Sequence, residues 1–207
     1  MSKTAFLFPG QGVQKCGMGK DFYENSSQAA NLFEKASEAL GLDMKALCFE
    51  ENARLDQTEY TQAALVTTYL AMCRELESRG VKPDITAGLS LGEYAAIAVA
   101  GAMSDLDAIR LVRKRGMLMQ NTVPAGEGAM CAILALDEKK IEEVLNEIPD
   151  VTIANYNCPG QIVITGKTAA VEMAAARLKE NGARRTLMLN VSGPFHSPML
   201  EPAGAAL

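Results

Sequence analysis

The sequence predicts an α/β protein in which a small ferredoxin-like subdomain is inserted into a larger α/β domain. Of the 207 residues, 48% are apolar and 22% are charged, the balance of an ordinary globular chain. A short strand, a sharp turn and an alanine-rich helix follow one another over residues 85–100. Between residues 126 and 191, strand and helix patterns succeed each other in the order βαββαβ, which is typical of the ferredoxin-like arrangement. We therefore expect segments 1–125, 126–191 and 192–207, the last returning to the large domain.

The first segment is predicted to open with a buried strand. The apolar run from Thr4 to Pro9 ends in Pro-Gly-Gln-Gly, which is typical of a strand that stops in a tight turn. Three- and four-residue spacings of apolar residues then predict helices over residues 31–40 and 62–76, the second closed by Gly80.

A strand–turn–helix pattern surrounds Ser90. Residues 85–89 are a predicted strand, Ser90 follows at once, and residues 91–100 form a predicted helix. A further helix starts at Ser104, whose hydroxyl can cap free amides, and runs towards Gln120.

In the subdomain, the apolar residues alternate between the two-residue period of strands and the three- to four-residue period of helices. Its expected elements are a strand over residues 129–136, a helix over 138–148, strands over 151–156 and 161–165, a helix over 169–181 and a strand over 185–191.

Composition excludes several classes of protein. The five cysteines form no CxxC pair and the chain has one histidine, so neither a disulfide framework nor a metal site is expected. No apolar run reaches the ~18 residues of a membrane span, and the N-terminal apolar stretch is too short for a signal peptide. We expect a soluble, cytoplasmic protein that does not bind membranes.

Charge argues against nucleic-acid binding, because the net charge is -5 and the isoelectric point is near 5.1. Two local basic clusters could still meet an acidic partner, and solvated helix faces explain them equally well. The clusters are Arg110, Arg113, Lys114 and Arg115, and Lys179, Arg184 and Arg185.

A candidate nucleophile lies in Gly88-Leu89-Ser90-Leu91-Gly92, which fits G-x-S-x-G. In that motif the serine occupies a strained strand-to-helix turn and the glycines allow a close backbone passage. The alternative is a serine that caps a helix. A catalytic serine needs a base, and His196 is the candidate, although a lone histidine is more often structural. The amides of Leu91 and of the Gly10-Gln11-Gly12 turn are candidate oxyanion donors; an ordinary loop is the alternative for the turn.

Several blocks together resemble the malonyl-CoA:acyl carrier protein transacylase family. They are Phe8-Pro9-Gly10-Gln11-Gly12, Gly88-Leu89-Ser90-Leu91-Gly92-Glu93-Tyr94, Arg113-Lys114-Arg115-Gly116-Met117 with Met119-Gln120, Asn157-Cys158-Pro159-Gly160-Gln161, and Gly193-Pro194-Phe195-His196-Ser197. The resemblance implies an α/β-hydrolase-like large domain around the ferredoxin-like subdomain. It also implies that no cofactor is needed and that malonyl-CoA is the substrate.

The resemblance assigns a role to each matching residue. Ser90 would form a malonyl ester in fatty-acid biosynthesis, His196 would move the proton, and the Gln11 and Leu91 amides would hold the oxyanion. The phosphopantetheine thiol of acyl carrier protein would take the malonyl group. Arg115 would grip the malonyl carboxylate; from the residues alone, a cation near a helix end ahead of Gly116 explains it better. Phe195 would disfavour an α-methyl group, and Gln62 would line the pocket.

The chain departs from the family pattern in two ways. Leu89 replaces the histidine that usually precedes the nucleophile. The chain also ends eleven residues after His196, so we expect a truncated transacylase with a less firmly held base and part of the sheet edge exposed. The alternatives are a serine esterase or thioesterase and an inactive carrier-binding fragment. A monomer is expected.

Overall fold

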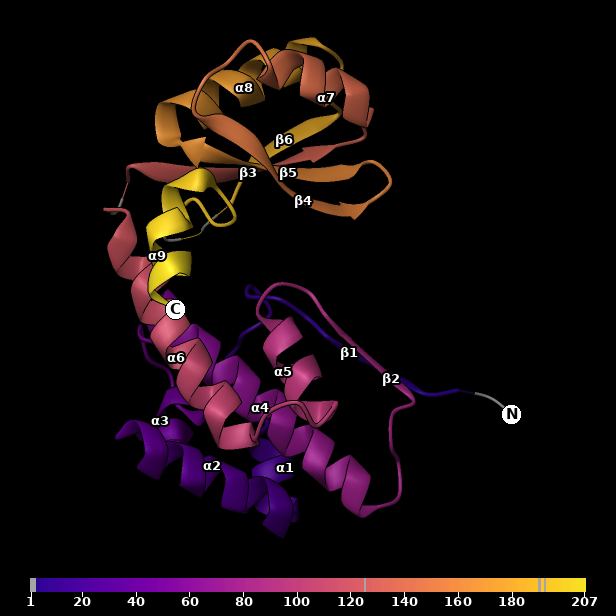
Figure 1. The fold of residues 1–207 in the computed structure, drawn as a ribbon, viewed down its shortest axis with the longest axis vertical. Coiled ribbons are helices and arrows are strands. Elements are labelled where there is room, and N and C mark those ends of the chain that lie inside the picture. The colour runs from indigo at the N-terminus through magenta and orange to yellow at the C-terminus, as the bar shows by residue number, and fades with distance from the viewer. Residues whose placement is uncertain (1–2, 125, 190, 192) are drawn as a thin grey trace. The chain divides into compact units, whose positions relative to one another are not determined.

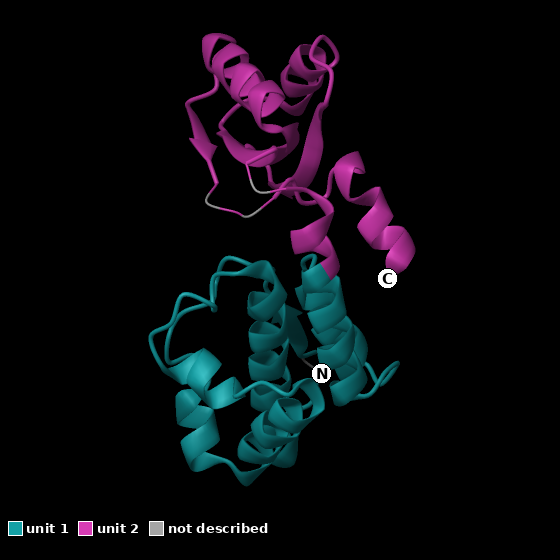
Figure 2. Cartoon of the chain, turned by 90° about the vertical axis from the view of Figure 1, so that its left-hand side faces the viewer, with its two compact units in different colours: residues 1–117 teal, residues 118–207 magenta. Residues whose placement is uncertain are grey.

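Two units make up the chain in its computed structural model, which describes residues 3–124, 126–189, 191 and 193–207. The units are residues 1–117 and 118–207 (Figure 2). The division falls within one helix, and each unit has its own core. The expected segment boundaries at residue 125 and at Ser192 lie outside the described residues.

The first unit combines a two-stranded parallel sheet with a group of helices (Figure 1). Strand β1 (Ala5–Phe8) pairs with β2 (Ile85–Gly88). The helices are α1 (Lys20–Asn25), α2 (Ser27–Leu40), α3 (Met44–Phe49), α4 (Thr58–Ser78), α5 (Gly92–Val99) and α6 (Asp105–Thr122). The sequence patterns give no expectation for α1 or α3, because six residues are too few to show a helical period.

Helix α4 is the central helix of the first unit. It packs against α1, α2, α3 and α5, and residues on all its sides are buried. It begins at Thr58, a full turn before the predicted start, because its first turn is Thr-Glu-Tyr-Thr and lacks the apolar period used to predict it. The early start adds Thr58 and Thr61 to the helix, and both are buried, as is Gln62.

The prediction that β1 is a buried strand is wrong. Leu7 is 73% exposed and Ile85 of β2 is 56% exposed, whereas Phe8 on the opposite face is buried. Side chains alternate between the faces of a strand, so in this unit only one face of the sheet meets the helices.

The second unit follows the order βαββαβ. Its elements are β3 (Gly128–Leu134), α7 (Glu138–Leu145), β4 (Val151–Cys158), β5 (Gln161–Lys167), α8 (Thr168–Glu180) and β6 (Arg185–Met188), followed by the 3-10 turn η1 (Pro198–Leu200) and α9 (Glu201–Ala206). The strands lie in the order β4-β5-β3-β6, and every neighbouring pair is antiparallel. Strand β6 is shorter than predicted, and the predicted end of that strand includes Asn190, which lies outside the described residues.

Helices α7 and α8 cover one face of this sheet (Figure 1). Ile133 and Ile164 of the sheet pack there against Ile141 and Leu178 of the two helices. A smaller apolar cluster lies on the opposite face, with Met119, Val123, Met130, Ala132, Val163, Phe195, Leu200 and Ala203 as its buried members.

The cysteines are free thiols that differ in their surroundings. Burial raises the pKa of Cys48 and of Cys73 to about 12, and that of Cys131 to about 11. Cys158, at the end of β4, is exposed. Because the thiolate is the reactive form, the buried thiols are held inert.

None of the helices that the structure describes is both long enough and apolar enough to cross a membrane. The same part of the chain holds no group of three or more side chains placed to bind a metal ion.

Candidate active site

Ser90 lies in a strained turn between β2 and α5. Its φ is +51°, in the left-handed region that residues other than glycine rarely adopt. Two glycines make the turn possible: a Cβ on Gly88 would lie 2.1 Å from the Gly92 carbonyl carbon, and one on Gly92 would lie 2.1 Å from the Phe8 carbonyl oxygen. The motif therefore has the close backbone passage that the sequence predicts.

The helix-capping alternative for Ser90 is wrong. Helix α5 begins at Gly92 and its N-cap is Leu91, with no side-chain hydrogen bond at the cap. The Ser90 side chain is instead partly exposed and accepts a hydrogen bond from Arg115.

Replacing Ser90 with glycine should make the protein more stable than replacing it with alanine, by about 1 kcal/mol, because only alanine keeps the left-handed strain. The measurement is the free energy of unfolding in urea. The control is Ala100→Gly, where φ is -69° and glycine should not stabilise. Equal stability of the two Ser90 variants would contradict the strain.

Arg115 of α6 lies beside the candidate nucleophile. Its Nη2 donates to Ser90 Oγ at 3.3 Å and its Nη1 donates to Gln62 Oε1 at 2.9 Å. Its guanidinium also lies over the Tyr94 ring, 5.4 Å from the ring centre. Burial lowers the pKa of Arg115, and its ring partner Tyr94 opposes that shift.

The hydrogen-bond and ring partners of this cation in the described chain are neutral, and Glu93 acts on it only through its charge. No aspartate or glutamate among the described residues forms an ion pair with Arg115, whereas its neighbour Arg113 is paired with Glu59 at 2.8 Å. A half-buried guanidinium with neutral partners can still make two parallel hydrogen bonds to an incoming carboxylate.

Close packing of α6 on α4 sets the position of Arg115. A Cβ on Gly116 would lie 2.7 Å from the Thr58 carbonyl oxygen, so glycine is needed for this approach. The helix continues through Gly116 to Thr122. The interpretation of Arg115 as a cation near a helix end is therefore wrong.

Two backbone amides near Ser90 are available to a ligand. The turn that contains Gln11 follows β1, and Ser90 follows its partner strand β2, so both lie at the same end of the sheet. Within the described part of the chain, the amides of Gln11 and Leu91 donate to no protein acceptor. Leu89, between the strand and Ser90, is 52% exposed.

Phe195 and His196 belong to the second unit. Phe195 is 7% exposed and packs in the smaller apolar cluster with Leu200. His196 is exposed, and its φ of +59° places it in the left-handed region. It lies in the segment between β6 and η1.

Sequence reasoning missed Thr58 and Tyr94 as neighbours of the site. Thr58 accepts a hydrogen bond from Gln11 and Tyr94 lies beside Arg115. Tyr94 ends the sequence block that begins at Gly88 and contains Ser90, and it lies about one helical turn after Ser90. That block could therefore have indicated it. The pattern around Thr58 gives no comparable signal.

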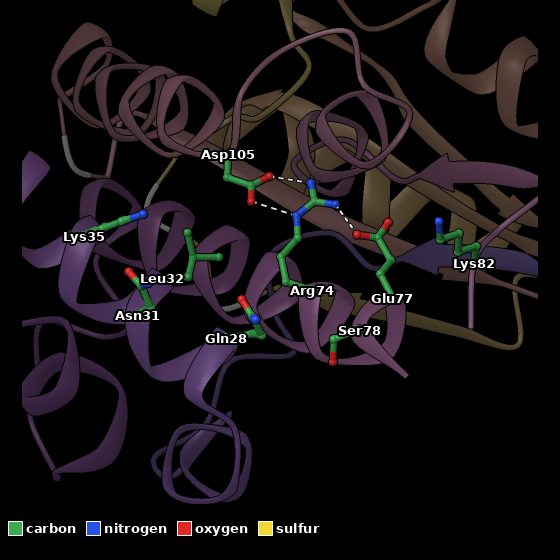
Figure 3. A pocket seen from close by; sticks show the side chains of 9 residues that line it. All are labelled: Gln28, Asn31, Leu32, Lys35, Arg74, Glu77, Ser78, Lys82 and Asp105. Atoms are coloured by element: carbon green, nitrogen blue, oxygen red, sulfur yellow. Dashed lines mark hydrogen bonds and ion pairs between the residues drawn. The ribbon is translucent and has the colours of Figure 1, made fainter. Parts of the chain in front are cut away.

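A pocket of about 570 Å³ elsewhere in the first unit contains none of the candidate residues (Figure 3). Arg74 of α4 donates there to both carboxylate oxygens of Asp105 and also to Glu77. These bonds raise the pKa of Arg74. They fix the start of α6 to α4, and so support the helix that carries Arg115.

A serine exposed at a strained strand-to-helix turn fits an enzyme that forms acyl-serine esters, and the comparison with known families agrees. The model described as "acyl transferase domain" matches residues 5–207. The malonyl CoA-acyl carrier protein transacylase of Bacillus subtilis is 50% identical over 212 residues, which cover 100% of this chain and 67% of that protein. The chain thus belongs to the malonyl CoA-acyl carrier protein transacylase family.

Solved structures agree in fold. The malonyl CoA-acyl carrier protein transacylase of Clostridium perfringens is 44% identical with a TM-score of 0.95, over 99% of this chain and 66% of that one. A malonyl-transacylase solved in complex with its type II PKS acyl-carrier protein is 41% identical with a TM-score of 0.95, over 99% of this chain and 68% of that one. The chain spans about two thirds of the length of these relatives.

Proposed function

We propose that this protein transfers a malonyl group from malonyl-CoA to the phosphopantetheine thiol of acyl carrier protein, in fatty-acid biosynthesis. The observation that carries the proposal is the position of Arg115, 3.3 Å from the Ser90 hydroxyl and without an ion pair to a carboxylate among the described residues. A malonyl ester on Ser90 ends in a carboxylate two carbons from its carbonyl. A guanidinium beside the ester oxygen is therefore well placed to bind that carboxylate.

Ser90 is the proposed nucleophile and His196 the proposed base. The Ser90 oxygen bonds to the thioester carbon while His196 takes its proton; the CoA sulfur then leaves and receives that proton. In the second half, the carrier thiol loses its proton to His196 and attacks the ester, and the proton returns to the Ser90 oxygen. This is double-displacement catalysis by a covalent intermediate.

The Gln11 and Leu91 amides are the proposed oxyanion donors. Each attack makes the carbonyl oxygen negative, and two amides fixed in advance stabilise that charge without rearrangement. Their lack of protein acceptors in the described chain supports this role.

Gln62 and Phe195 are the proposed selectivity residues. Gln62 is 1% exposed, and its Oε1 accepts from Arg115, which orients the guanidinium. Phe195 would exclude an α-methyl group by its bulk.

The proposed architecture is a hydrolase-like large domain with an inserted ferredoxin-like subdomain. The strand-turn-helix at Ser90 and the β4-β5-β3-β6 order of the second unit support it. Four properties stay predictions: that the protein is cytoplasmic, that it is a monomer, that it needs no cofactor, and that it binds neither membrane nor nucleic acid. The similarity to a transacylase in complex with its acyl-carrier protein supports the carrier as partner.

The test is to incubate the protein with malonyl-CoA, with and without acyl carrier protein, and to measure free malonate and malonyl-carrier. We expect transfer that depends on the carrier and little malonate, because the proposed acceptor is the carrier thiol. Rapid release of malonate without carrier would favour a hydrolase. Carrier binding without any malonyl adduct on the protein would favour an inactive carrier-binding fragment.

A further inference from the structure

A buried hydroxyl holds the turn that supplies one of the proposed oxyanion donors. Thr58, the first residue of α4, is 0% exposed. Its Oγ1 accepts a hydrogen bond from Gln11 Nε2 at 3.1 Å, across 47 residues of sequence. The Gln11 side chain is thus fixed to α4, while its backbone amide donates to no acceptor in the described chain.

The turn has little rigidity of its own. Gly10 and Gly12 flank Gln11, and glycines restrict the backbone least. A second link exists, because Gln14 accepts from the Gly12 amide at 2.8 Å and donates to Asp56 at 3.0 Å, but both bonds are exposed to solvent. The bond between Gln11 and Thr58 is partly buried, and a hydrogen bond shielded from water is electrostatically stronger than an exposed one, so it is the stronger restraint.

The same end of α4 also holds Arg115. Gln62 lies one helical turn after Thr58 and accepts from Arg115. The Thr58 carbonyl is the atom on which Gly116 packs. One turn of one helix therefore contacts both the proposed oxyanion turn and the proposed carboxylate-binding arginine.

We propose that Thr58 is a positioning residue for acyl transfer: its hydroxyl fixes the Gln11 side chain and thereby aims the Gln11 backbone amide at the developing oxyanion. This inference rests on the proposed function, in which that amide stabilises the oxyanion. Donors of this kind act only when they are held in place before the reaction, so losing the restraint weakens stabilisation of the transition state.

The test is Thr58→Val, which keeps the shape of the side chain and removes the hydroxyl. We expect the maximal rate of malonyl-Ser90 formation, followed by intact mass in single-turnover experiments, to fall about tenfold. The malonyl-CoA concentration at half-maximal rate should not change, because the oxyanion contact exists only in the transition state. Thr58→Ser keeps the hydroxyl and should restore the rate.

The matched control is Thr67→Val in the same helix. Thr67 is also 0% exposed, and its hydroxyl has no hydrogen-bond partner among the described residues. The same chemical change there should leave the rate unchanged, and thermal unfolding of all variants separates rate effects from loss of fold.

Four outcomes would overturn the inference. They are a Thr58→Val rate equal to that of the parent, a change confined to the half-maximal concentration, an equal loss in Thr67→Val, and a Thr58→Ser variant as slow as Thr58→Val. In each of these the parent still forms the adduct, so Ser90 stands as the nucleophile of the proposed function. A parent protein that forms no malonyl-Ser90 overturns both.

Discussion

Replacing Ser90 with alanine should abolish the malonyl adduct and lower transfer by about 10⁴-fold or more, because the oxygen that forms the ester is gone. The measurement is intact mass after brief exposure to malonyl-CoA. The parent should gain one malonyl-sized increment, and Ser90→Ala should gain none. This is the largest effect expected of any single substitution in the chain.

Ser78→Ala is the matched control, because Ser78 is an exposed serine of α4 whose hydroxyl donates to the Glu75 carbonyl. It should acylate like the parent. If Ser90→Ala still gains the malonyl increment at the parent rate, another residue is the nucleophile and the proposed mechanism fails.

Replacing Arg115 with alanine should lower kcat/KM for malonyl-CoA by about 10²-fold or more, because a charge-assisted pair in a half-buried site is lost. Acetyl-CoA has no carboxylate, so we expect the parent to use it with a much lower kcat/KM, which the substitution should change far less. The measurement is the ratio of kcat/KM for malonyl-CoA to kcat/KM for acetyl-CoA, and this ratio should fall towards one. Arg115→Lys should recover only part of the loss, since an ammonium cannot make two parallel hydrogen bonds.

Arg110→Ala controls for charge on the same helix. Arg110 is exposed and its ion partner is Asp107, at 3.7 Å. It should leave the ratio unchanged. An unchanged malonyl-to-acetyl ratio in Arg115→Ala would refute carboxylate binding by this residue, whereas lost stability alone would appear in thermal unfolding.

Local patterns predicted the turn at Ser90 well. The two glycines of the motif leave no room for a Cβ, so the pentapeptide and the sharp turn determine each other. The βαββαβ order of the second unit was also readable, because its strands and helices carry clear periods of two and of three to four residues.

The position of Arg115 needed long-range packing that no local pattern contains. Gly116 resembles a helix end in sequence, yet it lies within α6 and serves the contact with α4. The contact between Gln11 and Thr58 likewise joins residues far apart in the chain. Burial of β1 was overestimated because an apolar run does not reveal whether helices cover both faces of a sheet.

The distribution of thiols makes this protein convenient for spectroscopy. Three of the cysteines are buried with strongly raised pKa values, Cys16 is partly buried, and Cys158 is exposed at the end of β4. A maleimide dye at neutral pH would therefore attach first to Cys158. Such a fluorophore would report on the second unit in the native sequence, with the candidate residues left chemically untouched.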